Sequence, residues 1–513
     1  MRTTSPRITD PTHTASPVAQ AQARPPRQSA GLALVLLGML TLAMSMSGTT
    51  IALPDIGTDL HASGAPLQWV ITGYFLTASS VMLVAGSVGD LIGRRRVYRA
   101  GAALFTAGLG LSALAPGIWV LDAARALAGL GAAGVMANGG ALLAATFTGP
   151  ARTKAFAALG TVGGIGLAAG PTVCGAMVGA VGWRPAFLGF AVAGALILAG
   201  TGVLAEVRGA SRTRLDAPGA AAFILALAVL LAAVTQGPQD GWTNPWVLAA
   251  FMTGFALLAG FVVRQQRAAH PVLDLTLVRD RPYLAWTLAG LAGAFGFVGA
   301  LSYLPSYLQG ANGVGASQAG ATMLLLTAPV LFAPLVSGRL VARGVPARWL
   351  ILVGLGLVTA GNAGLTVLHP GIGPAQLAAP LLAIGTGTGL ANGIIDGQAM
   401  NRVTPERVGM AAGFLNTVRG GGQALAIAVF GAALLSLLQA RVGSQSRAAL
   451  ILAGHLDGPD HAVLARQLAD AWQLVSLAVA VLVALTAAVI AALLFIPAKS
   501  PAKSPAKSPT AKR

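Results

Sequence analysis

Two pairs of oppositely charged residues stand inside long apolar stretches of this 513-residue chain. Asp122 precedes Arg125 by three positions, so both side chains share one face of a helix. Asp396 and Arg419 lie in two neighbouring apolar stretches of the second half. A carboxylate that loses water in one state and approaches an arginine in another would bind and release a proton. These four residues are therefore candidates for proton coupling.

Structural roles for the same residues remain open at this point. Asp122 and Arg125 could form an ion pair that only stabilises the end of an apolar helix. Asp396 could be a water-exposed position near the end of its own helix. Charged residues inside a bilayer are costly, and they usually face a wet cavity or a partner. We favour a functional role for Arg125 and leave both interpretations of Asp396 open.

The composition is that of a polytopic, all-α membrane protein. Hydrophobic residues make up 55% of the chain and charged residues 9%, which is too little charge to cover a soluble domain. The 67 glycines suit helices that pack backbone to backbone in lipid. Fourteen apolar runs are long enough to cross a bilayer. They cover residues 30–53, 68–88, 97–116, 118–146, 155–181, 185–206, 217–236, 246–263, 283–308, 318–338, 349–368, 376–400, 408–438 and 471–496.

Several classes of function are excluded. The net charge of +18 is spread over short segments between the apolar runs, so we reject a nucleic-acid partner. No glycine-rich segment ends in Gly-Lys-Ser/Thr, so we expect no nucleotide and no cofactor, and the energy must come from a gradient. The single cysteine excludes an internal disulfide, and we predict no metal site. A sparse His and Asp pattern over residues 455–461 is interpreted as a solvated loop.

The distribution of Lys and Arg predicts the topology. With both termini cytoplasmic, most basic residues fall on the inner side, as expected for a multi-pass protein of the inner (cytoplasmic) membrane. The expected domains are a disordered tail (1–29), a six-helix bundle (30–206), two inserted helices with a cytoplasmic linker (207–282), a second six-helix bundle (283–496) and a basic tail (497–513).

The segment GSVGDLIGRRR, residues 86–96, joins the second and third apolar runs by a short glycine-punctuated turn. It resembles the loop signature between helices two and three of the major facilitator superfamily, which locks one side of the transporter. The resemblance implies a gating role for Gly86, Asp90, Gly93 and Arg94. Leu91 stands where the family usually has a basic residue.

Two further segments resemble motifs of the same superfamily. LDAARALAGLGAA, residues 121–133, is similar to its second motif, and this implies that Arg125 tunes a proton-accepting carboxylate. GLAAGPTVCG, residues 166–175, is similar to the motif associated with antiporters rather than importers. Its matching residues, which would allow a pivoting bend and close helix contact, are Gly166, Gly170, Pro171 and Gly175.

The first span ends in TTIALPDI, residues 49–56, which resembles the first-helix signature of the same branch. That signature often carries an Asp where this chain has Ser45. An acid that would favour cationic drugs is therefore absent from this helix.

Polar residues at helical spacing predict a substrate cavity. Asn392 shares a helix face with Asp396, and Asn416, Arg419 and Gln423 form a stripe that is costly to expose to lipid. Tyr303 is a further substrate-cavity candidate. Weaker candidates are Trp69, Tyr74, Asn138, Tyr307 and Gln309.

Taken together, the resemblances cover almost the whole membrane region and are closest to the fourteen-helix drug:proton antiporters. They imply the major facilitator fold, with two six-helix bundles and two inserted central helices. They also imply a monomeric, non-enzymatic transporter that exports a drug, antibiotic or metabolite by alternating access. The alternatives are proton-coupled uptake of an anionic or neutral solute and a membrane sensor without transport.

Overall fold

The computed structural model of the chain describes residues 26–147, 149–207, 216–267, 279–403, 408–456 and 459–495. Within these ranges the chain forms fourteen long α-helices and one short helix, α15 (Gln445–Leu452). The long helices of the first part are α1 (Pro26–Asp59), α2 (Ala65–Ile92), α3 (Arg94–Ala113), α4 (Ile118–Thr146), α5 (Gly149–Val181), α6 (Trp183–Gly200), α7 (Ala217–Asp240) and α8 (Pro245–Arg267). Those of the second part are α10 (Arg281–Asn312), α11 (Ala316–Ala342), α12 (Ala347–Gly364), α13 (Pro374–Met400), α14 (Val408–Val442) and α16 (His461–Phe495).

In the described part of the chain, twelve of these helices are long and apolar enough to cross a membrane. The two long helices outside this group, α2 and α3, meet at the charged turn. α3 begins with three arginines, Arg94 to Arg96, which lower its mean hydropathy. Fourteen spans are compatible with the helices, but that number stays a prediction.

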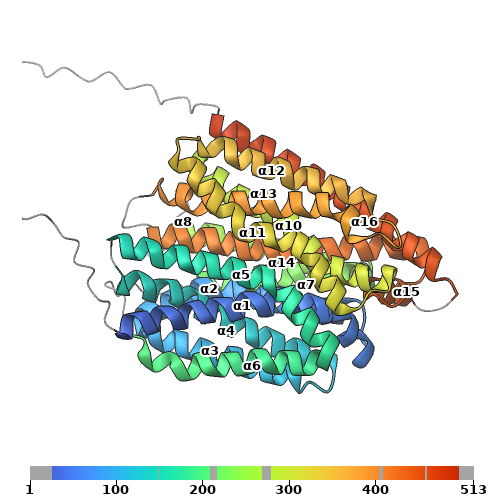
Figure 1. The fold of residues 1–513 in the computed structure, drawn as a ribbon, viewed down its shortest axis with the longest axis horizontal. Helices are drawn as coiled ribbons and strands as arrows, with labels where there is room; N and C mark the ends of the chain where they lie inside the picture. Colours follow the sequence, from blue (N-terminus) through green and yellow to red (C-terminus); the bar gives the residue numbers. More distant parts are fainter. Residues whose placement is uncertain are drawn as a thin grey trace, which may run out of the picture.

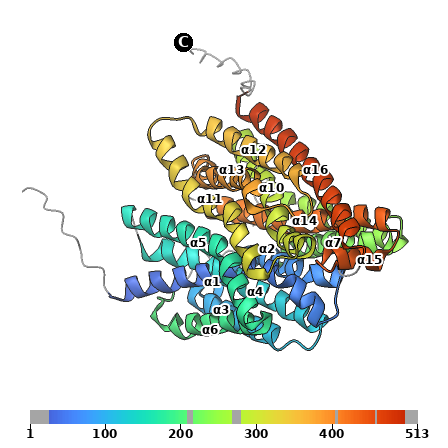
Figure 2. The same cartoon turned by 45° about the vertical axis from the view of Figure 1, so that its right-hand side comes forward.

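The long helices form two bundles that lie side by side. Helices α1 to α6 pack on one another as the first bundle, and α10 to α14 pack with α16 as the second bundle. Figure 2 shows the second bundle, coloured yellow to red, above the first, coloured blue to green. The bundles meet where α5 packs on α11, α2 on α14, and α1 on α10. α7 packs on both α2 and α14, and α8 packs on α7, so these two helices lie outside the bundles. The predicted domain boundaries themselves stay predictions.

The molecule has two distinct ends, which orient the site. At one end, called the termini end, α1 begins and α16 ends; the other, called the α15 end, carries the short helix (Figure 1). α16 begins at His461, well before the span predicted from residue 471. The added turns are helical because Leu464, Ala465 and Leu468 are buried at helical spacing against the second bundle.

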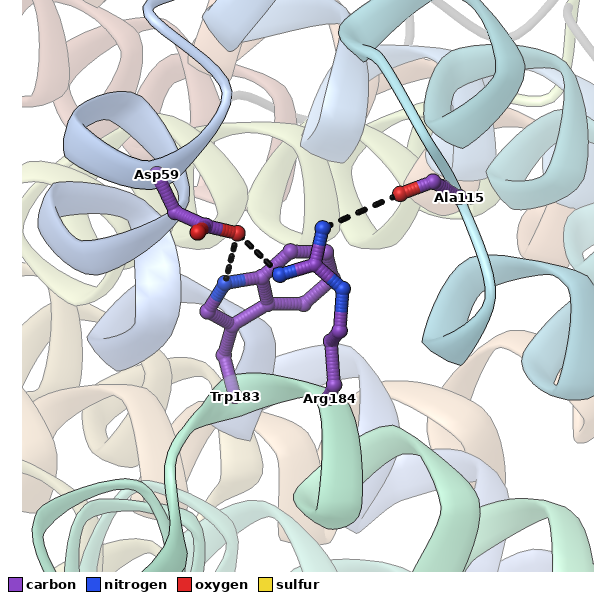
Figure 3. Close-up of polar contacts among 4 residues, drawn as sticks. All are labelled: Asp59, Ala115, Trp183 and Arg184. Atoms are coloured by element: carbon purple, nitrogen blue, oxygen red, sulfur yellow. Dashed lines mark hydrogen bonds and ion pairs between the residues drawn. The ribbon is translucent and has the colours of Figure 1, made fainter.

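A polar cluster joins three segments of the first bundle at the α15 end (Figure 3). Asp59, the last residue of α1, accepts a hydrogen bond from Trp183 Nε1 at 3.2 Å and forms an ion pair with Arg184. Arg184 also donates to the backbone oxygen of Ala115 at 3.2 Å, between α3 and α4. The cluster therefore holds the ends of α1 and α3 against the start of α6.

A second polar cluster connects the inserted helices. Asp216 caps the N-terminus of α7 by accepting a hydrogen bond from the Gly219 backbone N–H at 3.1 Å. It also accepts hydrogen bonds from Arg264 at 2.7 Å and Gln265 at 3.0 Å, both near the C-terminus of α8. Burial would raise the pKa of Asp216, but these hydrogen bonds and the Arg264 charge outweigh burial and hold the pKa below its usual range.

We predict that Asp216→Ala lowers the stability of the protein by about 2 kcal/mol, because it removes the acceptor shared by the Gly219 N–H, Arg264 and Gln265. A lowered pKa stabilises the fold fully above the ordinary aspartate pKa of 3.8. This stabilisation is lost as the pH falls through the lowered pKa. Thermal unfolding of the detergent-solubilised protein, measured against pH, tests both effects.

Asp280→Asn is the matched control for this prediction. Asp280 caps α10 through the Tyr283 backbone N–H at 2.8 Å, and asparagine caps a helix equally well. Its Tm should therefore stay near that of the wild type. Equal Tm values for Asp216→Ala and the wild type would contradict the role given to the Asp216 cluster.

Candidate functional site

The turn between α2 and α3 consists of one residue, Gly93. The sequence of residues 86–96 suggested a longer turn, but Gly86 and Gly89 are still part of helix α2. Gly93 has a φ of 115°, which residues with a Cβ rarely adopt, so the helix breaks there. A Cβ at Gly93 would also lie 2.8 Å from the carboxyl carbon of Glu206. The turn therefore requires glycine for its conformation, whereas the overlap with the end of the flexible Glu206 side chain could be relieved by a change of that side chain.

The described contacts of this turn hold it to its own bundle. Arg94 donates to the backbone oxygen of Ala141 on α4 at 2.9 Å, and its backbone N–H donates to Val207 at 2.9 Å. Arg96 lies 3.7 Å from the Glu206 carboxylate. The side chain of Asp90 is outside the described part of the structure. Its gating role therefore stays a prediction.

Glu206 is a residue that the sequence reasoning missed. It lies just after the short 3-10 helix Thr201–Val203 that follows α6, and its carboxylate lies beside both Gly93 and Arg96. An acid at the last position of the sixth predicted span, on the same predicted membrane face as three arginines, was the available signal. The opposite charges now explain why the segment after α6 returns to the turn.

Asp122 and Arg125 lie in the interior of the first bundle but do not form the ion pair considered from the sequence. Arg125 is 1% exposed, donates from Nε to the Val70 oxygen at 3.2 Å, and places its guanidinium 4.5 Å from the centre of the Tyr74 ring. Both carboxylate oxygens of Asp122 are buried without a hydrogen-bond partner. The guanidinium thus contacts α2, and the buried carboxylate has neither a hydrogen-bond partner nor an ion-pair contact in the described structure.

The antiporter-like segment of α5 lies between α1 and α11. On the α1 side, a Cβ at Gly166 would lie 2.7 Å from Ala43 Cβ, and one at Gly170 would lie 2.8 Å from the Met44 oxygen. On the α11 side, a Cβ at Gly175 would lie 2.6 Å from the Ala316 oxygen. These glycines therefore allow backbone contact within the first bundle and across to the second.

α5 continues as a helix through Pro171. Pro171 and its neighbour are in contact with the second bundle, since the Thr172 hydroxyl donates to the Gly320 oxygen at 3.0 Å. A Cβ at Gly320 would lie 2.6 Å from the Pro171 oxygen. The proposed pivot lies in this seam between the bundles.

Asp396 and Arg419 are brought together in the second bundle. Arg419 Nη2 on α14 lies 2.5 Å from Asp396 Oδ1 on α13. The Asp396 side chain is 59% exposed, whereas Arg419 is 23% exposed and its Nε is buried without a partner. Asn392 is exposed on the same face of α13, and Gln423 is half-buried. The side chain of Asn416 is outside the described part.

Tyr303 does not belong to this group. It lies on α10 toward the α15 end, is 4% exposed and donates to the Ile427 oxygen at 3.1 Å. Asp396 is instead close to the end of α13 at the termini end. The predicted substrate-cavity residues are therefore divided between two ends of the molecule.

Further contacts between the bundles cluster at the α15 end. Gln309 on α10 donates to the Ile51 oxygen on α1 at 3.2 Å. The ring of His455, which follows α15, lies 2.5 Å from the Thr58 hydroxyl on α1. His455 is therefore half-buried against the first bundle rather than part of a fully solvated loop.

Comparison with known proteins identifies the family. The profile described as Major Facilitator Superfamily matches residues 35–427, which is more than half of the chain. The chain belongs to the major facilitator superfamily. It is therefore a multi-pass membrane transport protein and not an enzyme.

Relatives of this transporter carry names related to drug resistance. It is 34% identical to the multidrug resistance protein Stp of Mycobacterium tuberculosis over 79% of this chain and 75% of the relative. It is 29% identical to the tetracenomycin C resistance and export protein of Streptomyces glaucescens over 80% of this chain and 76% of the relative. A solved inward-facing structure of a bacterial homologue of the lysosomal transporter Spinster superposes with a TM-score of 0.63. It covers 92% of this chain and 97% of the other at 17% identity, which supports the shared fold.

We predict that Gly89→Ala destabilises the transporter by about 1–3 kcal/mol, because the added methyl group would overlap the Asn138 side chain. Asn138 also donates to the Ala85 oxygen of α2 at 3.1 Å, so it cannot move freely. The double variant Gly89→Ala/Asn138→Ala should recover part of the loss. Melting temperatures of the purified single and double variants provide the measurement.

Gly110→Ala on α3 is the control, since no atom lies within 4 Å of a Cβ at that position. It should leave stability unchanged or raise it by up to about 1 kcal/mol, because alanine favours helix. An equal effect of alanine at positions 89 and 110 would show that the close contact between α2 and α4 has no energetic importance.

Proposed function

We propose that this transporter exports a drug-like small molecule across the cytoplasmic membrane in exchange for protons. The asymmetry of the contacts between the bundles carries the proposal. Gln309, Thr172 and His455 contact the opposite bundle at or toward the α15 end. At the termini end, Asp396 is largely exposed and pairs within its own bundle. Closure at one end with an exposed charge at the other is the arrangement that alternating access requires.

The excess of Lys and Arg in the segments at the termini end supports a cytoplasmic position for that end. In this orientation, the state described here is closed toward the outside. The direction of transport rests on the relatives, two of which are named for resistance or export. The antiporter-like packing of Gly166, Gly170 and Gly175 agrees with export.

Two acids in opposite environments support proton coupling. The Asp122 oxygens are buried without a donor, so an ionised carboxylate there would be costly. Asp396, by contrast, is 59% exposed and has Arg419 as an ion-pair partner at 2.5 Å. We therefore assign Asp122 as the proton carrier. We assign Asp396 as a charged group at the cytoplasmic opening, which in this orientation is the termini end. Arg125, three residues from Asp122, would supply the charge that releases the proton if its guanidinium left Tyr74 in another state of the cycle.

We predict that Asp122→Asn abolishes net export driven by a pH gradient but retains exchange of labelled for unlabelled substrate, which requires no net proton movement. The assay uses inside-out vesicles from a host without its own exporters and a panel of antibiotics that includes tetracenomycin C. Asp396→Asn should slow export only in part, because it removes a charge at the cytoplasmic opening and leaves the proton carrier Asp122 in place.

Asp240→Asn is the matched control, because this exposed carboxylate at the end of α7 accepts a hydrogen bond from Trp246 that an amide can also accept. It should transport like the wild type. Full net export by Asp122→Asn would exclude Asp122 as the carrier. Accumulation in right-side-out rather than inside-out vesicles would replace export by uptake.

A further inference from the structure

A small cavity lies between the two bundles, directly beneath α15. Leu53 and Gln68 line it from the first bundle, Tyr303 and Ser306 line it from α10, and Ala449 and Leu452 of α15 cover it. Because residues of both bundles form its wall, its size must change whenever the bundles move relative to one another. It is distinct from the Asp396–Arg419 pair, which lies at the opposite end.

Gln68 is the polar group of this cavity with unused hydrogen-bonding capacity. Its side chain is 6% exposed, and both its amide nitrogen and its amide oxygen are buried without a partner. Burying an amide in this way is unfavourable unless a partner is supplied. The side chain lies against α14 because position 431 is glycine, where a Cβ would lie 3.2 Å from the Gln68 amide carbon.

Tyr303 provides an aromatic surface on the facing wall. Its ring stacks on Phe430 at 5.7 Å between centroids, and its hydroxyl donates to the Ile427 oxygen at 3.1 Å. The hydroxyl oxygen therefore still has acceptor capacity. Phe430 in turn packs on Trp472 at 5.1 Å, so the Tyr303 ring is held rigidly.

α15 and the residues after it close this cavity on the outer side through contacts with two helices, α7 and α1. Gln445 at its start donates to the Gln239 oxygen of α7 at 2.6 Å. His455 beyond its end contacts Thr58 of α1. The cavity measures about 20 Å³, far below the roughly 300–1,000 Å³ of sites for drug-sized ligands. A ligand can therefore occupy it only after α15 and the first bundle separate.

We propose that Gln68 and Tyr303 form an exit subsite, which binds an uncharged, largely apolar aromatic molecule carrying both a hydrogen-bond donor and an acceptor. This inference rests on the proposed export function and names its substrate class. The lining contains no ionisable acid or base besides the Tyr303 phenol. A cation would therefore lose its hydration at this position without gaining a countercharge. Ser45, buried on α1 where the branch often has an acid, is likewise uncharged.

The test compares transport of tetracenomycin C, an uncharged aromatic probe, with transport of ethidium, a permanent cation. Gln68→Leu keeps the approximate volume and removes two buried polar atoms, so folding is not compromised. We expect it to lower the export rate of the uncharged probe about tenfold, the loss expected for one buried hydrogen bond. Ethidium should not be exported by either protein.

Gln318→Leu provides the matched control, because Gln318 is exposed on α11 at the same end of the molecule. It should transport like the wild type. Equal rates for Gln68→Leu and the wild type would overturn the subsite while leaving export intact. The subsite would also be overturned if the wild type exports ethidium and Gln68→Leu exports it at the same rate. If no compound of the antibiotic panel moves in either direction, the export proposal itself fails.

Thiol labelling of the purified transporter measures binding separately from transport. Cys174 is the single cysteine and is 3% exposed, so Ala449→Cys on the α15 wall of the cavity introduces one reactive position and leaves Gln68 in place. N-ethylmaleimide should label this thiol when the cavity widens, and tetracenomycin C should slow the labelling whereas ethidium should not. Labelling that is unaffected by tetracenomycin C, or no labelling at all, would overturn the subsite.

Discussion

Close contact between helix backbones is the constraint on which this structure depends. Lipid offers no hydrophobic drive for one helix to bind another, so packing must come from short-range contact between small residues. Gly166 and Gly170 bring α5 against α1, while Gly175 and Gly320 bring it against α11. One helix thereby connects the interior of the first bundle with the seam to the second. A methyl group at any of these glycines would push apart elements that are now in close contact.

Polar side chains between these packed helices form hydrogen bonds with groups of the neighbouring helices. Arg94 and Asn138 donate to backbone oxygens on neighbouring helices, and Asp216 collects donors from both inserted helices. Such bonds are well suited to a low-dielectric environment, where an unpaired polar group is costly. They lie within a bundle or within the α7–α8 pair. Each of these units can therefore move as a body while the seams between the bundles rearrange.

The charged residues and the proposed exit cavity lie in different parts of the molecule. Asp122 and Arg125 lie inside the first bundle, and Asp396 with Arg419 lies toward the termini end of the second. The cavity at Gln68 has an uncharged lining at the other end. If export proceeds as proposed, a substrate would leave the charged region before it reaches the outer face, and proton binding would be separated from substrate release.

The sequence by itself determined the helices, the family and the residues of its motifs, because apolar length and the spacing of glycine, proline and charge are local properties. It also indicated correctly that Asp396 and Arg419 could meet. Only the tertiary structure decided that Arg125 turns to Tyr74 and away from Asp122, that Glu206 contacts the Gly93 turn, and that Tyr303 lies far from Asp396. It also placed Gln68 beneath α15. These outcomes depend on which distant helices become neighbours and how their side chains share the space, and no spacing along a single helix contains that information.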